Sequence, residues 1–251
     1  MYRKLLLVSL LLCSALQAQV AVVNAASFAT NQGVAAGSWA AAFVTVGGLT
    51  TATATTLPFP TTLGGVRLTV NGIAAPLFDV RQITAQQAQV TFLVPAGVTA
   101  GLQPVAVTAP TTSTNGTVRI ISAAPGIFEK EGTNPPKGAI INQSGIENSA
   151  ALPAKKGEVI SIYGTGPGAF KTAYTDGVAP GAAPLVETKS TPQVFISGVV
   201  AEVKYSGLNP SSPGLWQINV VVPNLAFITG KVPVSIFIDG VDSNQVAVFV
   251  Q

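Results

Sequence analysis

The stretch Ser206–Pro223, SGLNPSSPGLWQINVVVP, decides the fold class of this chain. Its Gly, Pro, Asn and Ser residues predict a turn-rich loop over Gly207–Gly214, and the apolar residues that follow predict a strand over Leu215–Val222. Successive residues of a strand point to opposite faces of its sheet. The face that carries Trp216 is apolar at every position, so Trp216 is predicted to point into the core of a β-sandwich.

A thinner copy of this stretch lies earlier in the chain, at Gln86–Pro95 (QQAQVTFLVP). The positions around the two copies also match: Gly37 with Gly157, Asn71-Gly72 with Ser197-Gly198, Pro95 with Pro223, and Val105 with Val234. The separation of the matched positions increases from 120 to 129 residues, a drift that loops can absorb. The chain is therefore predicted to be one β module duplicated in tandem.

Short alternating segments between turn residues, and the lack of a sustained apolar period of 3.6 residues, predict an all-β chain. In the first module, strands are predicted at Ser38–Val46, Val66–Val70, Ala75–Val80, Ala88–Val94, Pro104–Ala109 and Thr117–Ile121. In the second, strands are predicted at Glu158–Tyr163, Gln193–Ile196, Val199–Tyr205, Trp216–Val222, Val232–Ile238 and Gln245–Val250. This spacing of strands is typical of two tandem β-sandwiches.

Other segments of the first module have less regular patterns. Val20–Phe28 is expected to form a short edge strand that ends at Asn24, and Thr50–Thr62 is expected to be an uncharged surface loop or edge excursion. Turns are predicted at Asn71-Gly72 and around Asn115-Gly116, because Asn-Gly favours tight hairpins. The candidate core residues of the returning strand are Leu77, Phe78 and Val80.

These patterns predict the boundaries of the parts. Residues 1–18 are assigned to a signal peptide, 19–121 to the first sandwich, 122–155 to a connector and 156–251 to the second sandwich. The connector is expected to hold one short strand at Ala139–Asn142. About 100 residues suffice for a core, so a fragment that begins near Lys155 is expected to fold alone.

The N-terminus has the three parts of a secretory signal peptide. Arg3 and Lys4 precede the apolar run Leu5–Leu12, and Ala18 is a small residue suited to cleavage. Cys13 raises the alternative of a lipid anchor, although Leu12 is not the small residue that such a signal requires before the cysteine. A third alternative is that the segment is retained as an anchor. We expect a protein that is secreted or held at the cell surface.

The composition excludes several classes of function. The chain has no histidine, one cysteine and only 9% charged residues, and cleavage after Ala18 would remove Cys13 and two of the cations. The remaining charges form no basic stripe of the kind that nucleic-acid binding requires. Beyond the N-terminus no apolar run approaches the roughly 18–20 residues that span a bilayer. The usual general base, zinc ligands and thiolate nucleophile are missing, and no G-x-S-x-G is present.

Several motifs together carry a family resemblance. They are VVNAASF (Val22–Phe28), PGIF (Pro125–Phe128), GAIINQSGIENSA (Gly138–Ala150), KKGEVISIYGTGPG (Lys155–Gly168) and the Tyr205–Pro223 block. In this order they resemble the C-terminal domain found in secreted proteins of Solibacter and related acidobacteria, over nearly the whole chain after the signal peptide. The resemblance implies immunoglobulin-like sandwiches of the IPT/TIG type, and it brings no catalytic residues to carry over.

Two loops are candidate ligand sites. Gly164–Gly168 (GTGPG) follows a strand as a phosphate-binding loop does, but Pro167 and the glycines argue against the helix that such a site requires, which favours a turn. Asp239–Asn244 is rich in oxygen ligands for calcium, although its place between two strands favours a hairpin turn. A weak calcium site at Asp239 and Asp242 stays open.

Carboxylates and aromatic residues supply the remaining candidates. The acidic residues are few and lie mostly in predicted loops: Asp79, Glu129, Glu131, Glu147, Glu158, Asp176, Glu187, Glu202, Asp239 and Asp242. A pair of them facing each other for glycoside hydrolysis is disfavoured. Trp39, Trp216, Tyr163 and Tyr205 suit either core packing or a sugar-stacking platform, and their strand positions favour the core.

The sequence thus predicts a secreted, non-enzymatic protein for adhesion, surface structure or protein interaction. A carbohydrate-binding module is the alternative, and an extracellular hydrolase that uses carboxylates is a weaker one. No catalytic, cofactor-binding or metal residue is assigned and no cofactor is expected. The expected partner is an extracellular protein or polysaccharide, with no nucleic acid and no membrane span after signal cleavage.

Overall fold

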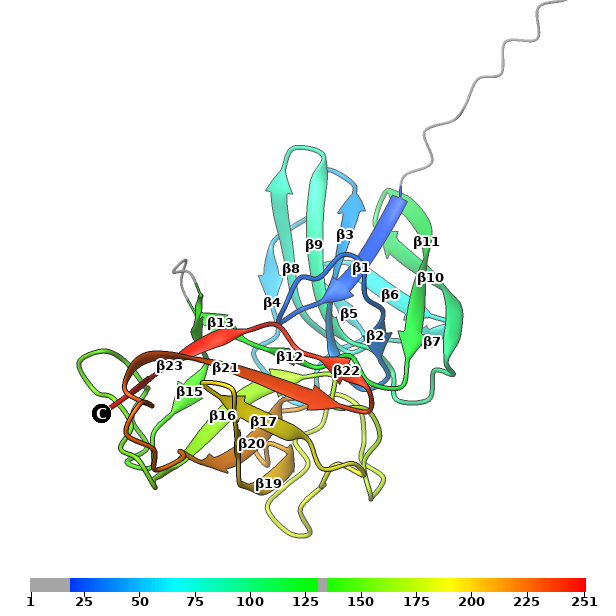
Figure 1. Cartoon of the computed structure of the whole chain (residues 1–251). Helices are drawn as coiled ribbons and strands as arrows, with labels where there is room; N and C mark the ends of the chain where they lie inside the picture. Colours follow the sequence, from blue (N-terminus) through cyan, green and yellow to red (C-terminus); the bar gives the residue numbers. More distant parts are fainter. Residues whose placement is uncertain (1–18, 131–134) are drawn as a thin grey trace, which may run out of the picture.

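The computed structural model describes residues 19–130 and 135–251, and every regular element in them is a β-strand (Figure 1). The predicted signal peptide and Cys13 lie outside the described residues. In the described part of the chain no helix is long and apolar enough to cross a membrane. The strands form two modules, the first above the second in Figure 1.

The first module is built from eleven strands, and backbone hydrogen bonds join nine of them in the order β4-β8-β9-β3-β1-β11-β10-β6-β5, with β2 beside β11 and β7 beside β6. The strands are β1 (Gln19–Asn24), β2 (Val34–Ala35), β3 (Trp39–Thr45), β4 (Ala52–Thr53), β5 (Thr62–Leu63), β6 (Val66–Val70), β7 (Ile73–Ala74), β8 (Leu77–Thr84), β9 (Gln87–Leu93), β10 (Gly101–Ala109) and β11 (Thr112–Ile121). β1 joins the two halves, because it pairs antiparallel with β3 and parallel with β11. The two halves enclose one core.

The second module holds two separate sheets around a second core. One has the order β12-β16-β20-β19 with β15 beside β16, and the other β13-β14-β23-β21-β17-β18 with β22 beside β21. The strands are β12 (Gly126–Ile127), β13 (Glu129–Lys130), β14 (Lys137–Gly138), β15 (Ile140–Ile141), β16 (Val159–Thr165), β17 (Gln193–Ile196), β18 (Val199–Ala201), β19 (Val203–Leu208), β20 (Trp216–Val221), β21 (Gly230–Ile238), β22 (Val241–Asp242) and β23 (Val246–Val250). The predicted fold class, all-β with two tandem immunoglobulin-like sandwiches, is confirmed.

The duplication appears in the hydrogen bonds themselves. Matched backbone bonds are Gly37 N–H to Val94 O and Gly157 N–H to Val222 O, and Asn71 N–H to Pro104 O and Ser197 N–H to Pro233 O, all 2.8 Å. The two hairpin turns also match, since Asn71-Gly72 and Ser197-Gly198 both have positive φ values, as a type I′ turn requires. The paired positions that the sequence suggested therefore occupy the same structural places.

The segment 122–155, expected to be a connector, contributes strands to the second module. β12 and β15 pair with β16, and β14 pairs parallel with β23. The side chains of Ile127, Ile140 and Ala154 are fully buried in the second core. β14 and β15 together repeat the role of β1, which likewise pairs with both halves of its module.

Three local predictions in the first module were wrong. β1 is not an edge strand, because β3 and β11 flank it. Asn115-Gly116 lies inside β11 opposite Ala106 and Val105, and the turn falls between Ala109 and Thr112. Gly116 serves instead to let β1 approach, since a Cβ there would lie 2.6 Å from the Val20 carbonyl oxygen.

The third error concerns the strand after the first hairpin. After the hairpin, only the short strand β7 pairs with β6. The chain then crosses to the other half of the module, where it forms β8 and pairs with β9. Leu77 and Val80 are buried as predicted, but the Phe78 side chain is 37% exposed and lies outside the core. An irregular register between Leu77 and Asp79 shifts the alternation of faces at this point.

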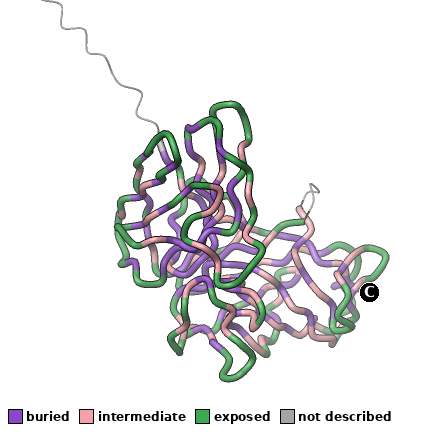
Figure 2. Tube along the Cα trace, turned by 180° about the vertical axis from the view of Figure 1, so that it is seen from behind, coloured by how far each residue is buried: buried purple, intermediate pink, exposed green. Residues whose placement is uncertain are grey.

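Direct hydrogen bonds join the two modules. The Trp39 N–H donates to Thr165 Oγ1 (2.7 Å) and the Asn24 side-chain amide donates to the Ala124 carbonyl (2.7 Å). Gly164–Gly168, predicted as a turn, is instead the end of β16 (Gly164 and Thr165) followed by irregular backbone over Gly166–Gly168. Gly166 passes close to the segment before β12, since a Cβ on Gly166 would lie 1.9 Å from the Ala124 oxygen. Figure 2 shows buried backbone running through both modules and the junction between them.

Asp176 also spans the junction. Its Oδ2 accepts a hydrogen bond from the Ala96 N–H (2.9 Å), while its buried Oδ1 has no hydrogen-bond partner among the described residues. Burial raises the pKa of Asp176 above its ordinary value of 3.8, and the bond from Ala96 offsets part of this effect. A group with a raised folded pKa favours the fold when protonated, so its contribution falls as pH rises from 3.8 through the folded pKa.

Asp176→Asn is therefore expected to raise the melting temperature at pH 7, because the amide carries no charge that burial would desolvate. The advantage should shrink as the pH falls toward about 4, where the native carboxyl is also neutral. Thermal melts between about pH 3 and pH 8 test this. Asp242→Asn, at an exposed position of β22, is the control. A pH-independent effect of Asp176→Asn would show that the charge of Asp176 does not matter.

Candidate ligand-binding site

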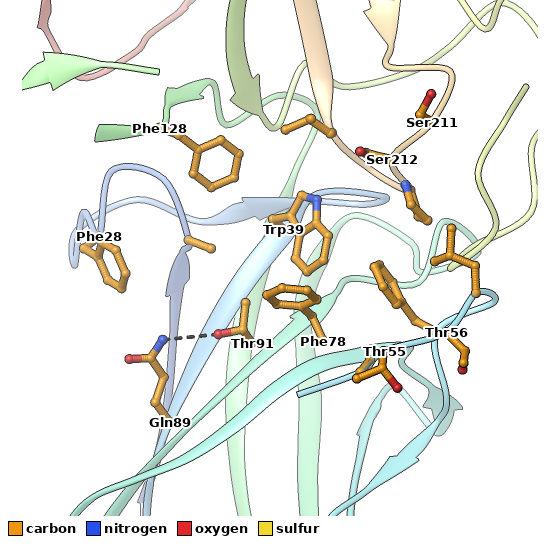
Figure 3. A pocket seen from close by; sticks show the side chains of 16 residues that line it. Phe28, Trp39, Thr55, Thr56, Phe78, Gln89, Thr91, Phe128, Ser211 and Ser212 are labelled. Atoms are coloured by element: carbon orange, nitrogen blue, oxygen red, sulfur yellow. Dashed lines mark hydrogen bonds between the residues drawn. The ribbon is translucent and has the colours of Figure 1, made fainter. Parts of the chain in front are cut away.

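A pocket of about 500 Å³ opens where the two modules meet (Figure 3). The first module supplies the start of β3, part of β8 and the loop that follows β4, and the second module supplies the loop before β20. The residues of that loop, Ser211–Leu215, belong to the turn-rich stretch that precedes the Trp216 strand. The volume is within the range of about 300–1,000 Å³ that is usual for small-ligand sites.

Three aromatic rings form the centre of the pocket. Trp39 contacts Phe59 (centroids 5.6 Å apart, planes at 67°) and Phe78 (5.4 Å, 85°). Phe59 and Phe78 contact each other at 5.7 Å and 64°. These edge-to-face arrangements are favourable for aromatic quadrupoles and fix the rings against one another. The part of the pocket wall that a ligand would contact is therefore a rigid cluster of aromatic rings.

Strand alternation explains why Trp39 is at the junction. In β3 the side chains of Ala40, Ala42 and Val44 enter the first core, so Trp39 points to the opposite face. The Trp39 side chain is 9% exposed, so it is buried, as the sequence favoured. It is buried against the second module, however, and is not part of the core of the first sandwich. Its N–H bond to Thr165 fixes the backbone from which the indole projects.

Neutral polar groups lie at the two ends of the pocket. Gln89 and Thr91 lie at one end, where the Gln89 side-chain amide donates to Thr91 Oγ1 (3.2 Å), and Thr55, Thr56, Ser211 and Ser212 lie at the other (Figure 3). None of the described residues that line the pocket is charged or is a histidine or cysteine. The arrangement suits an uncharged ligand with an apolar group for the aromatic centre and hydrogen-bonding groups on either side.

The other aromatic candidates are not part of this pocket. Trp216 is 0% exposed in the second core and its indole N–H donates to Ser206 Oγ (3.0 Å), which confirms its predicted orientation. The Tyr205 hydroxyl donates to the Leu208 carbonyl (2.8 Å). The structure therefore does not bring Trp39, Trp216, Tyr163 and Tyr205 together as one platform.

The acidic residues are likewise dispersed. Among the described residues no three of the His, Cys, Asp and Glu side chains cluster, and Glu131 lies outside the described part. Several carboxylates make ion pairs. The buried Asp79 pairs with the exposed Arg81, and at the surface Glu147 pairs with Lys130 and Lys137, Glu187 with Lys171, and Glu202 with Lys204. Hydrogen bonds from Lys130 and Lys137 lower the pKa of Glu147 to about 2. Asp239-Gly240 forms the predicted hairpin turn, with positive φ at both residues.

Sequence reasoning missed Phe59 and Phe78, which lie in the pocket with Trp39. A signal for Phe59 was present, since Leu57-Pro58-Phe59 places two large apolar residues in an uncharged loop. Phe78 gave no such signal, because the pattern Leu77–Val80 is that of an ordinary core strand.

No protein-family model matches the chain, and no curated protein matches it. Among solved structures, SGBP-B of the Bacteroides ovatus mixed-linkage glucan utilization locus, in complex with a mixed-linkage heptasaccharide, is 14% identical with a TM-score of 0.32. The match covers 87% of this chain, which spans only 42% of that one. The titin A168–A169 structure is 14% identical over 94% of this chain and 96% of its own (TM-score 0.26). InvD of Yersinia pseudotuberculosis is 9% identical over 93% and 58% (TM-score 0.25). Likeness at this level does not bear on the ligand.

Proposed function

We propose that this protein is an exported, non-enzymatic binding protein that holds an uncharged partner at the junction pocket. The pocket is the observation that carries the proposal. Its aromatic centre is partly open to solvent at Phe78. Among the described residues, the lining has no histidine, cysteine, lysine, tyrosine or carboxylate that could act as a general acid or base or activate its serine and threonine hydroxyls. The basic and apolar N-terminal segment supports export and a site of action outside the cell.

The proposed ligand chemistry is an apolar group of a partner protein. Aromatic and aliphatic side chains make up most of the centre, and burial of apolar area is the main source of binding free energy for such a lining. The absence of charge in the lining disfavours ionic ligands, since they would lose hydration without gaining a counter-charge.

A neutral carbohydrate is the second candidate. Aromatic rings flanked by hydroxyl and amide side chains suit the C–H face and the hydroxyl groups of a neutral sugar, and both kinds of residue line this pocket. The pocket is nevertheless mostly apolar at its centre, which places the carbohydrate second.

The test compares Phe78→Asp with Phe227→Asp. Phe78 lines the pocket, whereas Phe227 is 62% exposed in the second module and does not line it. The uncharged fluorophore N-phenyl-1-naphthylamine is titrated into each protein. A carboxylate in the apolar pocket should weaken its binding about tenfold or more, because an uncompensated charge must be desolvated. Phe227→Asp should leave binding unchanged.

Equal binding by the two variants would contradict the pocket as the binding site. Affinity electrophoresis in gels that contain neutral polysaccharides, such as mixed-linkage β-glucan, separates the two ligand classes. Retardation that Phe78→Asp abolishes and Phe227→Asp preserves would move the carbohydrate to first place.

A further inference from the structure

The outer edge of β4 is the feature that extends this proposal. On its inner side β4 pairs antiparallel with β8, Ala52 opposite Val80 and Thr53 opposite Asp79, and the Ala54 N–H donates to the Phe78 carbonyl (2.7 Å). Main-chain groups alternate between the two sides of an antiparallel strand. The N–H and C=O groups of Thr53, and those of Thr51 before it, therefore face away from the sheet.

The second module shows what such an edge accepts. There, Thr188 and Val186 bond to the outer side of β19 through Thr188 N–H to Ser206 O (2.9 Å) and Leu208 N–H to Val186 O (2.8 Å). This segment is the counterpart of β4, because β19 pairs with β20 as β8 pairs with β9. In this segment, the main-chain groups of Glu187 and Lys189 that point away from β19 are themselves hydrogen-bonded.

The occupant in the second module is an extended piece of the same chain. The Lys171 N–H donates to the Glu187 carbonyl and the Lys189 N–H donates to the Ala169 carbonyl, both at 2.8 Å. Phe170 is paired antiparallel with Thr188, and its ring packs on Tyr174 at 5.2 Å and 81°. An antiparallel strand with an apolar side chain thus covers this edge.

The first module has no counterpart of that strand. Within residues 19–130 and 135–251, no main-chain group is hydrogen-bonded to the outward groups of Thr51 and Thr53. β4 ends its sheet, and it lies on the outside of the upper module in Figure 1. Thr50–Thr56 contains no charge and no proline, the usual devices that prevent an exposed edge from pairing.

The edge leads directly into the pocket. Ala54, Thr55, Thr56 and Leu57 follow β4 and line the pocket. A strand added antiparallel to β4 would pass these residues with its N-terminal part, where one of its side chains could reach Trp39 and Phe78. Main-chain bonds along an edge, combined with a side-chain pocket, are a recurrent mode of peptide recognition.

We propose that β4 accepts an extended, uncharged segment of a partner protein as an additional antiparallel strand, with an apolar side chain in the junction pocket. This inference rests on the proposed function, since it names the partner class of the same pocket. The bonds to Thr51 and Thr53 position the segment, and the aromatic cluster selects its apolar residue.

The test uses peptides selected from a random 12-residue phage library against the protein and then synthesised individually. Thr53→Pro removes an outward N–H that β8 does not use, and proline is tolerated at such edge positions. Thr53→Val keeps the N–H and is the matched control, because both variants lose the hydroxyl that donates to Asp79 (2.8 Å). Thr53→Pro should weaken peptide binding about tenfold or more, because the ring removes a donor and obstructs the approaching strand. Thr53→Val should bind within about twofold of the parent.

The readouts also separate this inference from the pocket proposal. The two Thr53 variants should share one melting temperature and bind N-phenyl-1-naphthylamine normally. If the fluorophore binds at the pocket but Thr53→Pro and Thr53→Val bind peptides equally, the edge inference fails alone. If Thr53→Pro blocks peptides while Phe78→Asp has no effect on the fluorophore, the pocket proposal fails and the edge stands. A dimer in sedimentation that Thr53→Pro abolishes would assign the edge to a second copy and overturn the inference.

Discussion

Replacing Trp216 with alanine is expected to destabilise the second module by about 3–5 kcal/mol, the usual cost of truncating a buried tryptophan. The side chain is fully buried among Ile218, Val220 and Val222, and the substitution would leave a cavity between the two sheets. It would also remove the hydrogen bond to Ser206, which keeps its bond from Thr188. A domain has about 5–15 kcal/mol of stability, so the loss is a large share.

Chemical denaturation followed by far-UV circular dichroism measures this effect. Phe227→Ala is the control, because an exposed aromatic side chain contributes little and its loss should change the midpoint slightly. A Trp216→Ala protein that unfolds at the parent midpoint would show that the second core does not depend on this side chain. Fluorophore binding at the junction pocket should persist where the variant remains folded, since Trp216 does not line it.

A fragment of residues 155–251 is expected to be unfolded, and a fragment of residues 122–251 is expected to fold. This reverses the expectation drawn from the sequence. The shorter fragment lacks β12 and β15, which pair with β16, and β14, which pairs with β23. It also lacks Ile127, Ile140 and Ala154 from the core, so apolar area on the remaining strands would be exposed to water.

The amide spectra of the two isotope-labelled fragments check this prediction. Well-dispersed resonances are expected for residues 122–251 and narrow dispersion for residues 155–251. Well-dispersed resonances from the shorter fragment would mean that the strands before Lys155 are not required for the second module to fold. Narrow dispersion from both fragments would mean that the folding of the second module depends on its contacts with the first, including the hydrogen bond from Trp39 to Thr165.

The periodic parts of the fold were predictable because local and tertiary preferences agree there. The Trp216 strand alternates buried and half-buried residues as its sequence indicates, and the Asn71-Gly72 turn has the backbone that those residues favour. Asn115-Gly116 has the same local preference, but the close approach of β1 determines its conformation. That approach depends on residues far away along the chain, which local patterns do not report.

The pocket was harder to predict for a related reason. Its residues come from separate stretches of the chain, and the packing of one module on the other creates it. The sequence marks Trp39 as a candidate, yet alternation cannot distinguish a side chain that faces a sandwich core from one that faces a neighbouring module. Phe78 was assigned to the core because the irregularity at Leu77–Asp79 has no sequence signal.

The parallel pairing of first and last strands has a mechanical consequence. Gln19 and Val20 of β1 lie parallel to Asn115 and Gly116 of β11, and Lys137 of β14 lies parallel to Ala247 of β23. Tension that pulls the first strand of a module by its N-terminal end and the last strand by its C-terminal end acts along these strands, in opposite directions. The hydrogen bonds between them are then sheared together and share the load, whereas a hairpin pulled open would lose them one at a time. The first module thus resists stretching at β1, where tension would enter it, whereas in the second module β12 and β13 precede the parallel pair and would be loaded before it.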